Sequence, residues 1–295
     1  MDGMFADIIQ VLIGGTTTGL LYALLLLGVL IVFQVSGTIN FAYGQVGMAA
    51  ALGCWALYAR VGLPVPLAVT LALITGAVLS AMIERLAMRR VSAAQPGLDV
   101  VVTLGIFLFI TTAMELLVDA DSHSFLALGT NTGISVGGVS VNVSDAVVVI
   151  VSTIAVLGVW YFWNRTAVGL SARASASSAT IASAAGVDVP RLKTAIWAVS
   201  GLIVAVVAIL AASRLAVDPF YMTSLLIKAF VAGMIGGLNR FWTPLLIAVA
   251  LGIYESFVVY SLGASAAVPA VFALVIVALG LTPQRLVDER KEARA

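Results

Sequence analysis

The sequence predicts an all-α, polytopic integral membrane protein with eight or nine transmembrane helices in a single domain, residues 1–295. Of its 295 residues, 62% are hydrophobic and 10% are charged, whereas an ordinary soluble domain is about 45–50% apolar and about 25% charged. Apolar stretches that suit a bilayer core of roughly 30 Å recur along the whole chain. The polar segments between them are too short to form a soluble domain.

Nine apolar stretches, separated by polar breaks, mark the expected helices. They cover residues 8–34, 40–59, 64–84, 100–118, 144–163, 192–213, 224–238, 243–262 and 266–281. The stretch 224–238 is short for a span and ends in a Gly-Gly pair, so it either crosses the membrane or re-enters it. The N-terminus carries Asp2 and Asp7 where a secretory signal carries Lys or Arg, so we expect the first helix to stay in the mature protein.

The basic residues predict the orientation. If 224–238 crosses, the connections 85–99, 164–191 and 238–242 lie on one side of the membrane with the C-terminal tail. That side then carries 12 of the 15 Lys and Arg residues, while the opposite side carries Arg60 and Arg214. By the positive-inside rule, the basic side is cytoplasmic, which places the N-terminus outside and the C-terminus in the cytoplasm.

The outer connection, about residues 119–143, contains a hairpin signal. Two alternating triplets, 134–136 and 139–141, both read Ile/Val-Ser-Val and flank Gly137-Gly138. This pattern predicts a small β-hairpin with a two-residue turn. The hairpin either docks an external partner or covers the helix ends as a plug.

The connection at about 164–191 has an unusual composition. Residues 174–185 are Ala, Ser and Thr apart from Ile181, and Gly186 and Pro190 follow. Gly and then Pro is the usual end of a helix. We therefore expect a short cytoplasmic helix whose small side chains fit a groove in another protein, with a plain surface linker as the alternative.

A few polar residues interrupt the apolar segments. Asn40, Tyr43 and Gln45 lie in one such break, and polar groups in lipid are costly unless they face protein or water. They indicate either a broken segment that lines a polar pathway or a capped and tightly packed helix end. Lys228 and Glu255 lie within predicted helices and could form an ion pair, although Lys228 could instead extend to the membrane surface.

The remaining composition argues against an enzyme or a metalloprotein. The chain has one cysteine, Cys54, and one histidine, His123, so a disulfide within the chain and a clustered metal or catalytic site are not expected. None of its three lysines follows a glycine, so the phosphate loop of an ATPase is absent. The net charge of +1 gives no reason to expect nucleic acid as a partner.

Three stretches resemble one family of transporters. Residues 39–45, Ile-Asn-Phe-Ala-Tyr-Gly-Gln, are similar to a family motif in which His and Glu replace Tyr43 and Gln45. Residues 169–174 and 186–189, which flank the small-residue helix, are similar to the loop that grips an ATPase, with Ser177 and Ser178 where acidic residues are usual. The third stretch consists of Lys-Ala-Phe at 228–230, Gly-Gly at 236–237 and Gly-Ile-Tyr-Glu at 252–255.

Over about residues 10–285 the chain resembles the LivH-type permease subunits of branched-chain amino-acid ABC importers. The resemblance implies a multi-pass protein of the bacterial cytoplasmic (inner) membrane that carries branched-chain or other small amino acids. It also implies a second homologous permease subunit, two ATPase subunits that bind the ATP, and an external solute-binding protein. A urea or short-amide ABC permease and an ion-coupled secondary transporter remain as alternatives, the latter because broken helices and sparse intramembrane charges also occur there.

The expected functional residues fall into two groups. The translocation path is expected to involve Asn40, Tyr43, Gln45, Lys228 and Glu255. Coupling to the ATPases is expected to involve Arg173, Ser177, Ser178, Ile181, Gly186 and Asp188.

Overall fold

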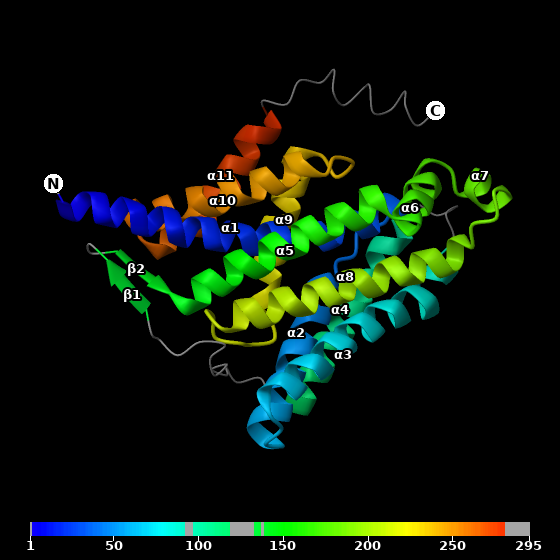
Figure 1. The fold of residues 1–295 in the computed structure, drawn as a ribbon, viewed down its shortest axis with the longest axis horizontal. Helices are drawn as coiled ribbons and strands as arrows, with labels where there is room; N and C mark the ends of the chain where they lie inside the picture. The colour runs from blue at the N-terminus through cyan, green and yellow to red at the C-terminus, as the bar shows by residue number, and fades with distance from the viewer. Residues whose placement is uncertain (1, 92–96, 119–132, 137–138, 281–295) are drawn as a thin grey trace.

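Each of the nine apolar stretches forms a helix in the computed structural model, which describes residues 2–91, 97–118, 133–136 and 139–280 (Figure 1). Within these residues, six helices are long and apolar enough to cross a membrane. They are α1 (Asp2–Ser36), α3 (Val65–Leu86), α4 (Leu98–Val118), α5 (Val143–Arg165), α8 (Val189–Ala212) and α10 (Trp242–Leu262). The predicted all-α polytopic class is confirmed.

Three further apolar helices are shorter. They are α2 (Tyr43–Trp55), which continues as a π-helical turn η1 (Ala56–Arg60), α9 (Tyr221–Gly236) and α11 (Ala267–Gly280). The 16 residues of α9 extend about 24 Å at 1.5 Å per residue, less than a bilayer core of roughly 30 Å. Gly237 ends this helix at φ +83°, in the left-handed region that favours glycine.

Helices α1 and α8 form the centre of the fold. Both are largely buried, whereas α4 and α5 are mostly exposed. The most extensive packing joins α1 to α10 and α3 to α8. Where α1 crosses α10, a Cβ on Gly19 would lie 2.6 Å from the carbonyl oxygen of Val249. Glycines therefore allow the two backbones to touch, as small residues do in membrane helix pairs.

The outward faces of the peripheral helices are apolar. On α4 the exposed side chains include Val101, Leu104, Leu108, Phe109, Leu116 and Leu117. A soluble monomer rarely exposes so continuous an apolar surface. This surface is suited to contact with lipid.

The two ends of the molecule differ in structure. Figure 1 shows the start of α1 beside the strands β1 (Gly133–Val136) and β2 (Val139–Asn142), and the helices α6 (Ala167–Ser177) and α7 (Ala179–Ala184) at the opposite end. The strands pair antiparallel with Ser135 opposite Ser140, so the predicted hairpin is confirmed. Gln10 Oε1 on α1 accepts a hydrogen bond from the Ser140 backbone amide at 2.9 Å. Gly137, Gly138, His123 and the tail 281–295 lie outside the described residues.

Candidate functional site

A largely buried ion pair and a neighbouring tyrosine join three helices. Lys228 Nζ on α9 lies 2.5 Å from Glu255 Oε1 on α10. The Tyr22 hydroxyl on α1 donates to the other carboxylate oxygen at 2.8 Å and accepts from Lys228 Nζ at 3.1 Å. Both charged side chains are only 13% exposed. The predicted pair is confirmed, and Lys228 points into the protein rather than to the membrane surface.

This cluster satisfies charges that would otherwise be costly. An ion removed from water loses several kcal/mol of hydration, by order of magnitude, unless a partner and further hydrogen bonds replace it. Lys228 and Glu255 neutralise each other, and Tyr22 supplies the additional donor. The cluster is therefore a neutral but strongly polar point between helices that are otherwise apolar.

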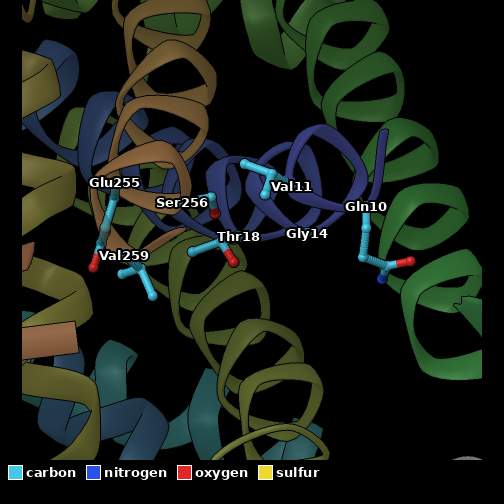
Figure 2. A pocket seen from close by; sticks show the side chains of 7 residues that line it. All are labelled: Gln10, Val11, Gly14, Thr18, Glu255, Ser256 and Val259. Carbon is cyan, nitrogen blue, oxygen red and sulfur yellow. The ribbon is translucent and has the colours of Figure 1, made fainter. Parts of the chain in front are cut away.

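A cleft of about 330 Å³ leads to this cluster between α1 and α10. Its lining combines hydroxyl, amide and carboxylate groups with two valines, and Figure 2 shows Gln10 at one end of the row and Glu255 at the other. The lining residues are Gln10, Val11, Gly14, Thr18, Glu255, Ser256 and Val259. Clefts that hold small molecules have volumes of about 300–1,000 Å³ and a similar mixture of apolar walls with a few polar groups.

The cleft follows one face of α1. Gln10, Gly14, Thr18 and Tyr22 are spaced four residues apart, so their side-chain positions lie above one another on the helix. Gln10 bonds to the hairpin, and Tyr22 bonds to Glu255. A continuous row of polar or small residues thus connects the hairpin end of the molecule with the buried ion pair.

Asn40, Tyr43 and Gln45 lie elsewhere, at the break between α1 and α2. Asn40 Oδ1 accepts from the Ala42 amide at 3.0 Å. The Tyr43 hydroxyl donates to the Ser200 carbonyl of α8 at 2.9 Å, and the Gln45 amide nitrogen donates to the Thr223 hydroxyl of α9 at 3.2 Å. These residues are buried and do not line the described cleft.

The break between α1 and α2 has unused hydrogen-bonding capacity. Thr38 Oγ1, Asn40 Nδ2 and Gln45 Oε1 are buried and have no hydrogen-bond partner among the described residues. A buried polar group without a partner costs about 1–3 kcal/mol. The helix break thus combines bonds that fix its position with polar atoms that remain available to another group.

The segment at the opposite end forms two short helices where the sequence predicts one. Ser178 interrupts residues 174–185 because its hydroxyl accepts from the Ile181 amide at 3.3 Å and caps α7. Ile181 is 72% exposed. Gly186 follows at φ +89°, and Asp188 caps α8 by accepting from the Arg191 amide at 3.1 Å. The turn between α7 and α8 is therefore defined by local caps, while α7 presents an exposed apolar side chain.

Two further predicted coupling residues, Arg173 and Ser177, form hydrogen bonds around α6. Arg173 is partly buried and donates to the carbonyl of Trp163 near the end of α5. Ser177 is exposed and donates back to the Arg173 carbonyl at 3.3 Å. Arg173 thus braces α6 against α5, whereas Ser177, Ile181, Gly186 and Asp188 are exposed.

The sequence alone did not predict a role for Tyr22, Thr18 or Ser256. A lone tyrosine, threonine or serine in an apolar helix is common, and Tyr22 lies 206 residues from Lys228. The one available signal for the cleft was a regular four-residue spacing, which links Gln10, Gly14, Thr18 and Tyr22.

Comparison with known proteins gives a consistent result. Residues 11–281 match the family model of the branched-chain amino acid transport system permease component. The chain is 26% identical over 262 residues to the high-affinity branched-chain amino acid transport system permease protein BraD of Pseudomonas aeruginosa, covering 84% of this chain and 85% of that protein. It is 25% identical over 270 residues to the permease protein LivH of Escherichia coli strain K12, covering 87% of each. No solved structure matches the chain significantly.

The family match extends over nearly all of the described helices, including the ion pair, the cleft residues other than Gln10 and the segment between α5 and α8. The chain therefore belongs to the family of permease components of branched-chain amino acid transport systems.

Proposed function

We propose that this chain is one permease subunit of an ATP-driven importer for branched-chain or other small amino acids in the bacterial inner membrane. The observation that carries the proposal is the family match over residues 11–281. The relatives named above are high-affinity branched-chain amino acid permeases, and this chain lacks a phosphate loop of its own. ATP is bound and hydrolysed by separate partner subunits.

The two ends of the molecule suit different partners. One of the two ATPase subunits binds at the end formed by α6 and α7, where Ile181 is exposed for a groove in the ATPase. The external solute-binding protein docks at the end formed by the hairpin and the start of α1. The N-terminus is then outside and the C-terminus is cytoplasmic, as the distribution of basic residues predicts.

The translocation path begins in the cleft between α1 and α10. Polar groups of Thr18, Glu255 and Ser256 line this cleft at a membrane depth where lipid would disfavour them. A second, homologous permease subunit covers the cleft and completes the path. The buried break with Asn40, Tyr43 and Gln45 shapes the path further along, and its unpaired polar atoms bond to another group when the helices tilt.

Purification and reconstitution test the proposed function. We expect the tagged chain, gently solubilised, to carry with it two ATPases with a phosphate loop and a second permease. In proteoliposomes the complex should import labelled leucine only with ATP and binding protein. A chain that purifies alone and moves solute under an ion gradient would instead establish the secondary transporter, which the buried intramembrane Lys228–Glu255 pair favours as the second candidate.

A competition series tests the substrate class. If the importer is specific for small amino acids, unlabelled branched-chain amino acids will suppress uptake of labelled leucine, and urea or acetamide will not. Suppression of uptake by urea or short amides would favour the alternative substrate class.

Cysteine labelling tests the proposed path. Thiol reagents that cannot cross the membrane react with a thiolate in water and not with a thiol in lipid. We expect Ser256→Cys and Thr18→Cys in the complex to react, and solute to slow the reaction. Two controls should stay unreactive: Ser200→Cys, which is fully buried, and Ile154→Cys, which is exposed on the apolar face of α5. Unreactive cysteines at Ser256 and Thr18 would show that the cleft faces lipid.

A further inference from the structure

A second cluster of polar groups, centred on a buried carboxylate, joins α3 to the first two turns of α8. Glu84 on α3 has a side chain only 4% exposed. Its carboxylate accepts from the Thr194 hydroxyl at 2.5 Å and forms an ion pair with Arg89, whose Nη2 lies 3.3 Å away. Arg89 belongs to the 3₁₀ turn η2 (Met88–Arg90) that follows α3, and it also donates to the Thr194 hydroxyl at 2.6 Å. The three side chains form a closed network.

Arg89 extends this network to the backbone of α8. Its Nη2 donates to the Pro190 carbonyl at 3.0 Å, and the Thr194 hydroxyl contacts the same carbonyl at 3.1 Å. Pro190 lies in the first turn of α8, two residues after the Asp188 cap and four after Gly186. We call the three side chains and the Pro190 carbonyl the α3–α8 joint.

The joint is attached to a rigid helix pair. Further along the same two helices, a Cβ on Gly76 would lie 2.6 Å from the carbonyl oxygen of Gly201, so the backbones are in contact there. Two helices held both at a backbone contact and at one end cannot easily slide or rotate separately. Displacement of the first turn of α8 must therefore carry α3 with it.

The position of the joint suggests its role. The segment 179–188 is joined to α8 through Gly186, and the joint binds α8 immediately after this connection. We infer that Glu84, Arg89 and Thr194 are positioning residues for energy coupling, because they transmit the movement of segment 179–188 to α3 as well as to α8. This inference rests on the proposed ATP-driven import. Without the joint, ATP hydrolysis moves the first turn of α8 but leaves the adjoining end of α3 behind.

The chain contains a matched control at the other end of the same helix. Arg214, which follows α8, lies 3.2 Å from Asp145 in the first turn of α5, and the Asp145 side chain is 8% exposed. This pair also anchors α8 through a buried carboxylate, but far from segment 179–188. A substitution at Asp145 should disturb helix packing without breaking the connection to the ATPases.

The test compares ATP hydrolysed per solute imported in the reconstituted complex. The wild-type complex is measured first. If it shows no ATP-dependent uptake, both the proposed function and this inference are overturned. For Glu84→Gln and Thr194→Val we expect uptake to fall about tenfold while ATP hydrolysis stays within about twofold of wild type. Thr194→Ser, which keeps the hydroxyl, should restore the wild-type ratio.

The control separates coupling from stability. Asp145→Asn should lower the thermal stability of the purified chain to an extent comparable with Glu84→Gln, yet leave the ratio of hydrolysis to uptake unchanged. The inference is overturned if Thr194→Val has the wild-type ratio, or if Asp145→Asn raises the ratio as much as Glu84→Gln does. Thr194→Val replaces a side chain by one of similar shape, so it keeps the test decisive if Glu84→Gln fails to fold.

Discussion

Lys228 Nζ and Glu255 Oε1 lie 2.5 Å apart in the interior of the helix bundle, where each is the charge that neutralises the other. Removing one partner leaves the other ion unpaired and largely buried, and for a fully buried pair this destabilises a protein by about 3–5 kcal/mol. Replacing both with neutral side chains removes this penalty. The ion pair therefore predicts that substituting both residues destabilises the protein less than substituting one of them.

Lys228→Met should lower the melting temperature of the detergent-purified chain markedly, whereas Lys228→Met with Glu255→Gln should recover much of the loss. Both melting temperatures can be measured from the fraction of monodisperse protein that remains after heating. Equal melting temperatures for the single and the double variant would show that the pair does not determine stability.

Gly252→Ala should weaken the contact between α1 and α10. A Cβ at this position would lie 2.7 Å from the carbonyl oxygen of Gly15, and backbone cannot move aside as a flexible side chain can. Forcing an extra carbon into such a contact costs about 1–3 kcal/mol. The measurement is again thermal stability of the purified chain.

Gly53→Ala is the matched control for this prediction. Gly53 also lies in a helix, α2, but a Cβ there would have no neighbour within 4 Å. Replacing a glycine in a helix interior by alanine stabilises by roughly 0.5–1 kcal/mol. A loss of stability from Gly53→Ala equal to that from Gly252→Ala would contradict the steric explanation.

Gly186→Val should uncouple ATP hydrolysis from uptake without preventing membrane insertion. Gly186 has φ +89°, and a Cβ added to it would have no neighbouring atom within 4 Å among the described residues. The cost of the substitution therefore lies in the backbone conformation, because a β-branched residue would force the backbone out of the left-handed region. The turn between α7 and α8 would change direction, and uptake should fall while hydrolysis continues.

Ala185→Val provides the comparison for Gly186→Val. Ala185 is the preceding residue, is exposed, and has φ −80°, which any residue can adopt. The Ala185→Val substitution should leave the ratio of ATP hydrolysis to uptake unchanged. If both variants uncouple equally, the backbone conformation of Gly186 is not the reason.

Gln45→Met should separate a pathway role from a packing role. Gln45 is fully buried, and its amide oxygen has no hydrogen-bond partner among the described residues. A methionine of similar length removes this unpaired polar atom together with the hydrogen bond to the partly buried Thr223 hydroxyl, so the two effects offset and the melting temperature should change little. If the amide serves the path, uptake should nevertheless fall several-fold. Unchanged uptake would assign Gln45 to packing alone.

Much of this fold can be predicted from the sequence because each helix must separately provide an apolar segment that suits the bilayer. An apolar run ended by Gly, Pro or charged residues determines where a helix begins and ends, and α10 (Trp242–Leu262) deviates from the expected 243–262 by one residue. The hairpin was likewise predictable, because alternation around Gly137-Gly138 is a local pattern. The break at Ser178 was not, since a serine within a run of small residues either continues a helix or caps the next one.

The candidate site was predictable only in part. Lys228 and Glu255 stand out because charges are rare in apolar helices, and an opposite charge is the expected partner. Glu84, Arg89 and Thr194 lie at a helix end, where polar residues are ordinary, so nothing in their pattern reveals the joint. The same holds for Tyr22 and Ser256, whose importance depends on which helix they face.

The sequence by itself determined the membrane-embedded class, the helix positions, the hairpin and the family, because lipid solvation and local backbone chemistry act on each segment separately. Only the tertiary structure decided which helices meet. It joined α1 to α10 through their glycines, placed Tyr22 on the Lys228–Glu255 pair, and bound α3 to the start of α8 through Glu84 and Arg89. Such contacts depend on the packing of segments distant in sequence, and no local pattern along the chain specifies them.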